Sequence, residues 1–145
     1  MTKGEKAKEL FESGLNCAQA VLCAFSEETG LPESTAKNIA LSFGAGMGRL
    51  REVCGAVSGM FMVAGLLYGD KNSKSEQYAL VQELAEKFKE ENGSIICREL
   101  LGVKGKESPI PDKRTNEYYK KRPCSEMVRI AADIMAQYVK EKENV

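Results

Sequence analysis

The sequence predicts an all-α fold, a single-domain bundle of about seven helices around a glycine-rich central helix. Three observations support this class. Apolar residues recur at helical spacing, glycines and capping residues divide the chain into helix-sized segments, and no segment alternates in the way of a strand. A length of 145 residues suits one hydrophobic core, so residues 1–145 are expected to form one four-cysteine helical domain.

In the first half of the chain, the expected helices are bounded by residues that favour helix ends, such as Asn16 before a helix and Gly30 after one. The expected helices cover Thr2–Ser13, Cys17–Thr29, Pro32 to about Phe43, and about Glu52 to Tyr68. Before the last of these helices, Gly44, Gly46 and Gly48 are expected to form a flexible turn.

In the second half, helices are expected from Ser73 or Ser75 through Asn92, over a short segment between Ser94 and Gly102, and from Pro123 to about Lys142. The intervening segment Val103–Arg122 is rich in lysine, proline and glycine. These residue types favour irregular structure, so the segment is expected to be an exposed loop.

The longest uncharged run of the chain, Val53–Gly69, predicts the central helix. The run is slightly short for a transmembrane helix and contains several glycines, so we expect a buried helix and no membrane insertion. Gly55 and Gly59 lie about one helical turn apart, and two missing side chains allow another backbone to approach closely. Such packing next to Cys54 can bring other cysteines near it.

The composition excludes several classes of function. Lys+Arg and Asp+Glu balance at 21 each, so no net charge attracts nucleic acid or an anionic membrane. The chain has no histidine, which excludes a Ser-His-Asp triad, a Cys-His pair and a mixed Cys/His zinc site. The polar segment Met1–Glu12 does not resemble a secretory signal, so a cytoplasmic location is expected. Cysteines in that reducing compartment more often serve metal binding, redox chemistry or burial than disulfides.

Four of the five cysteines, Cys17, Cys54, Cys97 and Cys124, lie on apolar helix faces that can turn toward one interior. Three of the four lie where a helix is expected to begin, and a helix N-terminus favours the thiolate over the thiol. Cys23 follows Cys17 by six positions, about 120° away around a helix, and is interpreted as an ordinary apolar residue. The chain has no Cys-x-x-Cys motif, which excludes a thioredoxin motif and a zinc knuckle.

The pattern of one cysteine, a Cys54-Gly55-Ala56-Val57-Ser58-Gly59 hexapeptide and two further cysteines is specific when taken together. The chain resembles, over nearly its full length, the family of small redox-active proteins named for this pattern, the C_GCAxxG_C_C family. The resemblance implies a redox role for the four cysteines, and family context suggests a link to a transporter system. The family is also similar to a domain of split-Soret cytochromes in which cysteines hold an iron–sulfur cluster.

The first hypothesis is a metal–thiolate site, which the sequence favours slightly over the alternatives. Four cysteine thiolates are the usual ligands of iron–sulfur clusters and of structural zinc. Under this hypothesis Cys17, Cys54, Cys97 and Cys124 bind an iron–sulfur cluster or zinc, and Gly55 and Gly59 border the cofactor. A cluster would serve electron transfer or redox sensing with a redox partner that the sequence does not identify.

Two alternatives remain open at this point. One is thiol–disulfide chemistry between two of the cysteines, with Cys54 or Cys124 as the attacking thiol. The other is a non-catalytic helical adaptor, whose docking surface would be the basic residues of the expected loop. These residues are Lys113, Arg114, Lys120, Lys121 and Arg122.

Overall fold

Helices form nearly all of the regular structure in the computed structural model, which describes residues 1–143 apart from the side chain of Lys121. The helices are α1 (Lys3–Glu12), α2 (Cys17–Ala24), α3 (Ser26–Thr29), α4 (Glu33–Leu41), α5 (Gly44–Met47), α6 (Gly55–Tyr68), α7 (Lys74–Asn92), α8 (Cys97–Leu101), α9 (Asn116–Lys121) and α10 (Cys124–Glu143). Residues 1–143 contain no strand, only an isolated antiparallel bridge between Val53 and Ile96. The predicted all-α class is confirmed.

Several helix boundaries follow from local capping residues and glycines. Thr2, Asn16 and Ser73 each accept a hydrogen bond from a backbone N–H in the first turn of α1, α2 and α7, and a Glu or Gln completes each capping box. Gly30 and Gly93 end α3 and α7 with positive φ angles of 71° and 90°, which cost glycine little.

The expected count of seven helices is too low. The expected helix Cys17–Thr29 is interrupted at Phe25, whose ring is buried in the core and whose φ and ψ of −105° and 20° leave the helical range. The expected turn after Phe43 is present, and its residues Gly44–Met47 form the short element α5. In the expected loop, the Thr115 side chain caps α9 by accepting from the backbone N–H of Tyr118. The expectation of a continuous loop there is therefore wrong.

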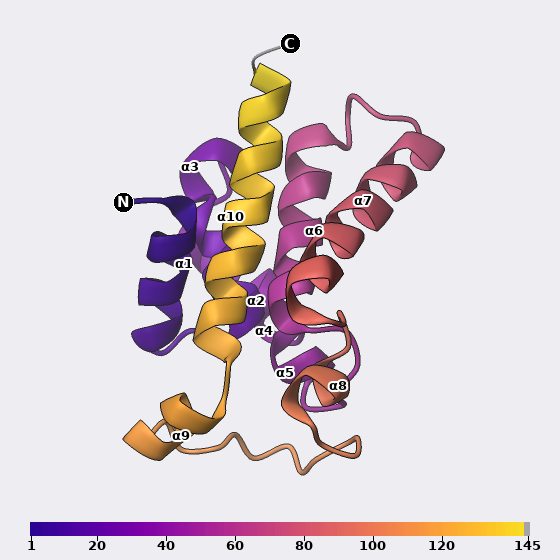
Figure 1. The fold of residues 1–145 in the computed structure, drawn as a ribbon. Helices are drawn as coiled ribbons and strands as arrows, with labels where there is room; N and C mark the ends of the chain where they lie inside the picture. Colours follow the sequence, from indigo (N-terminus) through magenta and orange to yellow (C-terminus); the bar gives the residue numbers. More distant parts are fainter. Residues whose placement is uncertain (144–145) are drawn as a thin grey trace.

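The glycine-rich helix α6 lies at the centre of the bundle, as the sequence predicts, and packs against α2, α7 and α10 (Figure 1). It begins later than the expected Glu52, because Cys54 is its N-cap residue. Helix α1 packs on α10 and α2 and closes one side. In the part of the chain that the structure describes, no helix is both long and apolar enough to cross a membrane.

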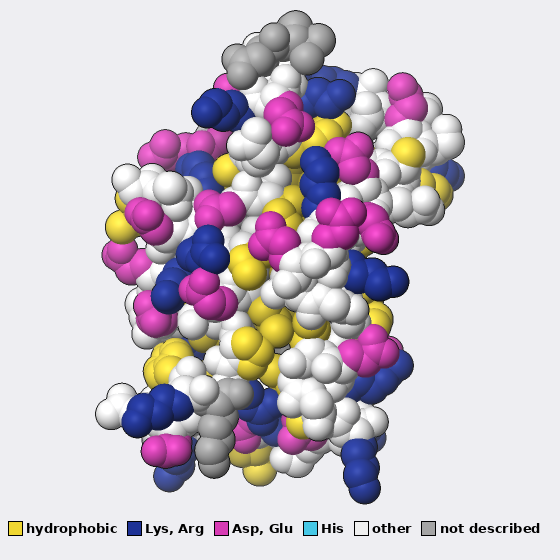
Figure 2. Space-filling view, viewed as in Figure 1, with side chains coloured by type: hydrophobic (Ala, Val, Ile, Leu, Met, Phe, Trp, Pro, Cys, Tyr) yellow, Lys and Arg dark blue, Asp and Glu magenta, His cyan; other side chains and the backbone are white. Residues whose placement is uncertain are grey.

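The helices α2, α6 and α10 all begin at the same end of the bundle, and α5, α8 and α9 gather at that end (Figure 1). Acidic and basic side chains are interspersed over the face shown in Figure 2, in keeping with the zero net charge. The first residues of α2, α6 and α10 therefore lie at one end of the bundle.

A candidate redox site of four cysteines

Each of the four predicted cysteines lies at the start of a helix. Cys17, Cys97 and Cys124 are the first residues of α2, α8 and α10, and Cys54 is the N-cap residue of α6. The sequence predicted three such positions; the boundary of α8 adds Cys97. All four cysteines line one cavity of about 360 Å³ at this end of the bundle. Cys23 lies apart from them in the hydrophobic core, as expected.

The close packing of α2 on α6 brings Cys17 to the start of α6. A Cβ atom placed on Gly55 would lie 3.3 Å from the Cβ of Cys17 and 3.0 Å from the carbonyl oxygen of Phe43. A Cβ on Gly59 would lie 2.8 Å from the carbonyl oxygen of Ala18. The two glycines therefore serve close backbone packing beside Cys54, the role that their spacing predicted.

A left-handed turn forms the floor of the cavity beside Cys17 and Cys97. Five consecutive residues have φ angles between 58° and 69°: Ala45, Gly46, Met47, Gly48 and Arg49. This conformation costs a residue with a side chain about 1–2 kcal/mol, so a run of this kind is unusual. The turn closes with a hydrogen bond of 2.9 Å from the Gly48 N–H to the Gly44 carbonyl. The glycine motif predicted a turn but not its hand.

The sulfur of Cys17 is stabilised as a thiolate. The thiol of Cys124 donates a hydrogen bond to it, and this bond is the main cause that lowers the pKa of Cys17 to about 6. Burial opposes the shift, whereas the backbone N–H of Ala45 and the charge of Arg114 support it. The left-handed turn thus contributes directly, because it directs the Ala45 N–H toward the sulfur.

The pKa values of the other three cysteines are raised, which favours the thiol form of each. The hydrogen bond to Cys17 and burial together raise the pKa of Cys124 well above its ordinary value. Burial, followed by the negative charge of Cys17, raises the pKa of Cys54 to about 12. Burial also raises the pKa of Cys97, although Arg51 offsets part of the shift by donating from Nη1 to Sγ over 3.5 Å. Of the four cysteines on the cavity, Cys17 alone has a lowered pKa, so it is the one that favours the thiolate.

Four arginines, Arg49, Arg51, Arg114 and Arg122, also line the cavity. Arg51 is 4% exposed and forms an ion pair of 2.6 Å between Nε and Glu107 Oε1. The guanidinium of Arg114 lies 4.0 Å from the ring centroid of Phe11 and donates to the carbonyls of Phe11, in α1, and Leu15, between α1 and α2. Nothing in the spacing or composition of the sequence marked these arginines as parts of the site.

The basic residues proposed as an adaptor's docking surface divide into two groups. Arg114 and Arg122 are half-buried and line the cavity, whereas Lys113 and Lys120 are exposed. The side chain of Lys121 lies outside the described residues. Two of the five charges therefore belong to the cysteine site, which weakens the case for a basic docking loop. A run of basic residues in sequence did not reveal that some of them turn inward.

The cysteines share a cavity without forming a ready coordination sphere. Across residues 1–143, no group of three or more Cys, Asp or Glu side chains is arranged to hold a metal ion. Zinc and iron–sulfur clusters need sulfur ligands at short and nearly equal distances from the metal. The sulfurs as placed do not form such a ligand set.

The fold and the site together define a small helical protein with four cysteines around one cavity. A protein-family model described as "Putative redox-active protein (C_GCAxxG_C_C)" matches residues 15–138, from just before Cys17 to beyond Cys124. The chain belongs to this family. The family description writes Gly before Cys in the hexapeptide, whereas this chain has Cys54 before Gly55. No curated protein and no solved structure matched the chain.

Proposed function

We propose that this protein is a dithiol redox protein in which Cys17 attacks a disulfide and Cys124 completes the exchange. The proposal is supported by the placement of Cys17 and Cys124 on one cavity, where Cys124 lowers the pKa of Cys17 to about 6. A thiolate with a pKa below the ambient pH is the attacking form in thiol–disulfide exchange. The free cavity volume beside Cys17 gives a substrate access to this sulfur.

The proposed reaction has two steps. In the first, the thiolate of Cys17 attacks one sulfur of a substrate disulfide, the substrate S–S bond breaks, and one substrate thiolate leaves. In the second, this leaving thiolate takes the proton of Cys124, whose sulfur attacks Cys17 and releases the second substrate thiolate. Two electrons pass from the protein to the substrate, and a Cys17–Cys124 disulfide remains.

The choice of Cys17 differs from the expectation drawn from the sequence, which favoured Cys54 or Cys124 as the attacking thiol. All of these residues lie at helix starts, so helix position does not distinguish them. The hydrogen bonds distinguish them, because Cys17 accepts one hydrogen bond from Cys124 and another from the Ala45 N–H. Cys124 fits the second step better, because it already lies against the sulfur that it must attack.

A trapping experiment tests the pair. After reaction with a small disulfide, Cys124→Ser should retain one substrate half on Cys17, whereas the unmodified protein should show a Cys17–Cys124 bond two mass units lighter than the dithiol. Peptide mapping by mass spectrometry distinguishes the two products. Cys23→Ser is the matched control, since Cys23 lies in the core, and it should behave like the unmodified protein. A defined disulfide between other cysteines would contradict the assignment.

A second candidate function is the metal–thiolate site expected from the sequence. It is supported by the four cysteines on one cavity together with four arginines, whose charges would offset those of additional thiolates. Coordination would require the side chains to rearrange, since the described residues hold no ready ligand set.

Anaerobic purification tests the metal–thiolate site. An iron–sulfur cluster would give broad visible absorption that bleaches on reduction, and bound zinc would appear in metal analysis. Under this function Cys97→Ser loses the metal, whereas Cys23→Ser keeps it. Colourless protein that is free of metal, even after reconstitution with iron and sulfide, would rule out the metal–thiolate function and leave only the dithiol function.

The proposed dithiol needs a reductant that returns the Cys17–Cys124 disulfide to the reduced form. We place this cycle in the cytoplasm, where a dithiol is maintained by the reducing environment. The transporter link suggested by the family context is a further proposal, and copurification with a membrane fraction would support it.

A further inference from the structure

The charge of the cavity differs from that of the whole chain. The chain carries no net charge, yet the charged residues that line the cavity are four arginines and one aspartate, Asp112. Arg49 is the last residue of the left-handed turn, Arg51 follows it two positions later, and Arg114 and Arg122 flank α9. Positive charge gathered on a cavity raises the local concentration of anions.

Asp112 occupies a position between two of these arginines. Its Oδ2 atom accepts from Arg49 Nη1 at 3.3 Å and from Arg122 Nη2 at 3.2 Å. These distances exceed the range of about 2.7–2.9 Å that is usual for a tight charge-assisted hydrogen bond. The Asp112 side chain is 40% exposed, while those of Arg49 and Arg122 are 11% and 20% exposed. The carboxylate is thus more exposed than either arginine, and neither of its ion pairs is tight.

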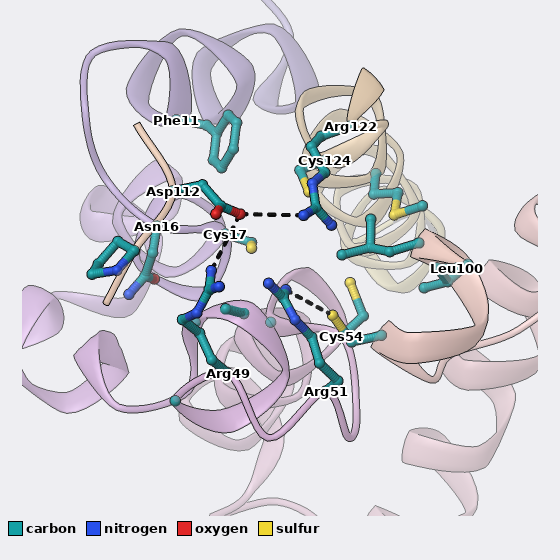
Figure 3. A pocket seen from close by; sticks show the side chains of 18 of the residues that line it. Phe11, Asn16, Cys17, Arg49, Arg51, Cys54, Leu100, Asp112, Arg122 and Cys124 are labelled. Atoms are coloured by element: carbon teal, nitrogen blue, oxygen red, sulfur yellow. Dashed lines mark hydrogen bonds and ion pairs between the residues drawn. The ribbon is translucent and has the colours of Figure 1, made fainter. Parts of the chain in front are cut away.

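Arg49 has partners other than Asp112 that hold it in place. Arg49 also donates from Nε to the carbonyl of Ser108 at 2.6 Å and lies 3.8 Å from Glu107. Figure 3 shows that the sulfur of Cys17 and the guanidinium groups of Arg49 and Arg122 face the same opening. A molecule bound through these guanidinium groups would therefore lie next to the attacking sulfur.

We propose that the cavity binds a small disulfide that carries a carboxylate, and that this carboxylate replaces Asp112 between Arg49 and Arg122. The inference rests on the dithiol function proposed above and adds the class of its substrate. Apolar side chains, among them Leu41, Leu100 and Met127, line the rest of the cavity and suit the body of such a molecule. A volume of about 360 Å³ lies within the usual range of small-molecule sites.

Asp112 has a defined role under this proposal. While no substrate is bound, it neutralises part of the charge of Arg49 and Arg122, and it leaves toward solvent when a stronger anionic ligand arrives. It therefore competes with the substrate. Removing its charge should strengthen the binding of an anionic disulfide, which is the opposite of what a direct substrate contact would show.

Two probes that differ in charge test the proposal. The first, 2,2′-dithiodipyridine, is neutral, and the second, 6,6′-dithiodinicotinic acid, has the same ring system with carboxylates. Each releases a coloured thione when Cys17 reacts. The measured quantity is the second-order rate constant for the anionic probe divided by that for the neutral probe, at pH 7 and low salt. This ratio cancels changes in the intrinsic reactivity of the sulfur.

For the unmodified protein the ratio should favour the anionic probe and should fall with added salt. Arg122→Gln should reduce it by about 10-fold, and Asp112→Asn should increase it several-fold, in line with the size of single charge contacts. Arg129→Gln is the control, since Arg129 lies on α10 outside the cavity and pairs with Glu126 and Asp133. It should leave the ratio unchanged.

Each outcome separates the inference from the function on which it rests. Fast reaction of Cys17 with both probes at a ratio that Arg122→Gln and Asp112→Asn do not move would overturn the anionic substrate class and leave the dithiol function standing. Slow reaction of Cys17 with both probes would overturn the dithiol function itself. A ratio that falls in Asp112→Asn would show that Asp112 assists the substrate, and would overturn its competing role.

Discussion

Iodoacetamide should alkylate Cys17 with a midpoint near pH 6, about three units below the ordinary value of 9.0 for a cysteine thiol. The thiolate is the reactive form, so a lowered pKa keeps Cys17 reactive as the pH falls toward 6 and makes the rate decline only below that value. The hydrogen bond from Cys124 is the main cause, and Cys124→Ala should therefore move the midpoint back toward 9.

The midpoint is more informative than the rate at a single pH. At pH 7 the lowered pKa increases the thiolate fraction by roughly two orders of magnitude. A less basic thiolate is also a weaker nucleophile, and on a logarithmic scale this offsets more than half of the gain in rate. Alkylation measured over pH 4–10 with peptide mapping gives the midpoint directly. Cys23→Ser should keep it near 6. A midpoint above 8 in the unmodified protein would contradict the thiolate assignment.

Gly46→Ala should reduce the free energy of unfolding by about 2–5 kcal/mol, the sum of a left-handed backbone cost and a steric cost. The new Cβ would lie 2.7 Å from the Cβ of Cys97 and 2.8 Å from the Cα of Arg51, with φ at 68°. Both neighbours are close to the backbone and cannot move as the end of a long side chain can. The turn should shift, and with it the Ala45 N–H that supports the Cys17 thiolate.

Gly48→Ala is the matched control for this change. Its φ of 63° is similar, but the nearest atom to the new Cβ, the Ser42 carbonyl oxygen, is 3.8 Å away. We expect a loss of only about 1–2 kcal/mol, the left-handed cost alone. Urea unfolding of both variants, together with the Cys17 alkylation midpoint, separates the steric contribution. Equal losses in the two variants would show that the contact with Cys97 carries no strain.

Local signals in the sequence were sufficient for most of the fold. Capping residues such as Asn16 and Ser73, and stops such as Gly93, act through hydrogen bonds and backbone freedom within a few residues, so a pattern along the chain reveals them. The break at Phe25 was not predictable in this way. It places a buried aromatic ring in a core made by distant helices, and tertiary packing there overrides the helical tendency of the segment.

The cysteine site also has some features that local sequence patterns predict and others that depend on distant residues. The apolar helix faces and helix starts correctly pointed Cys17, Cys54, Cys97 and Cys124 toward one interior. The arginines were missed because their direction depends on ion pairs with distant residues, as with Arg51 and Glu107. The left-handed geometry from Ala45 onward was missed for a related reason, since only packing against other segments holds residues with side chains in that conformation.

The positions of Cys17 and Cys124 near opposite ends of the chain have a consequence for the reduction potential of the proposed pair. A bond between them would close a loop of roughly 100 residues, which in the chain-entropy view stabilises the folded state by about 4–5 kcal/mol. By thermodynamic linkage, folding favours the disulfide by the same amount, equivalent to a potential roughly 100 mV lower than in the unfolded chain. The lowered pKa of Cys17 acts in the opposite direction, because it stabilises the reduced form. The electron-donating strength of the pair is then set by the whole bundle, and substitutions far from either sulfur that loosen α2 against α10 should make the dithiol a weaker reductant.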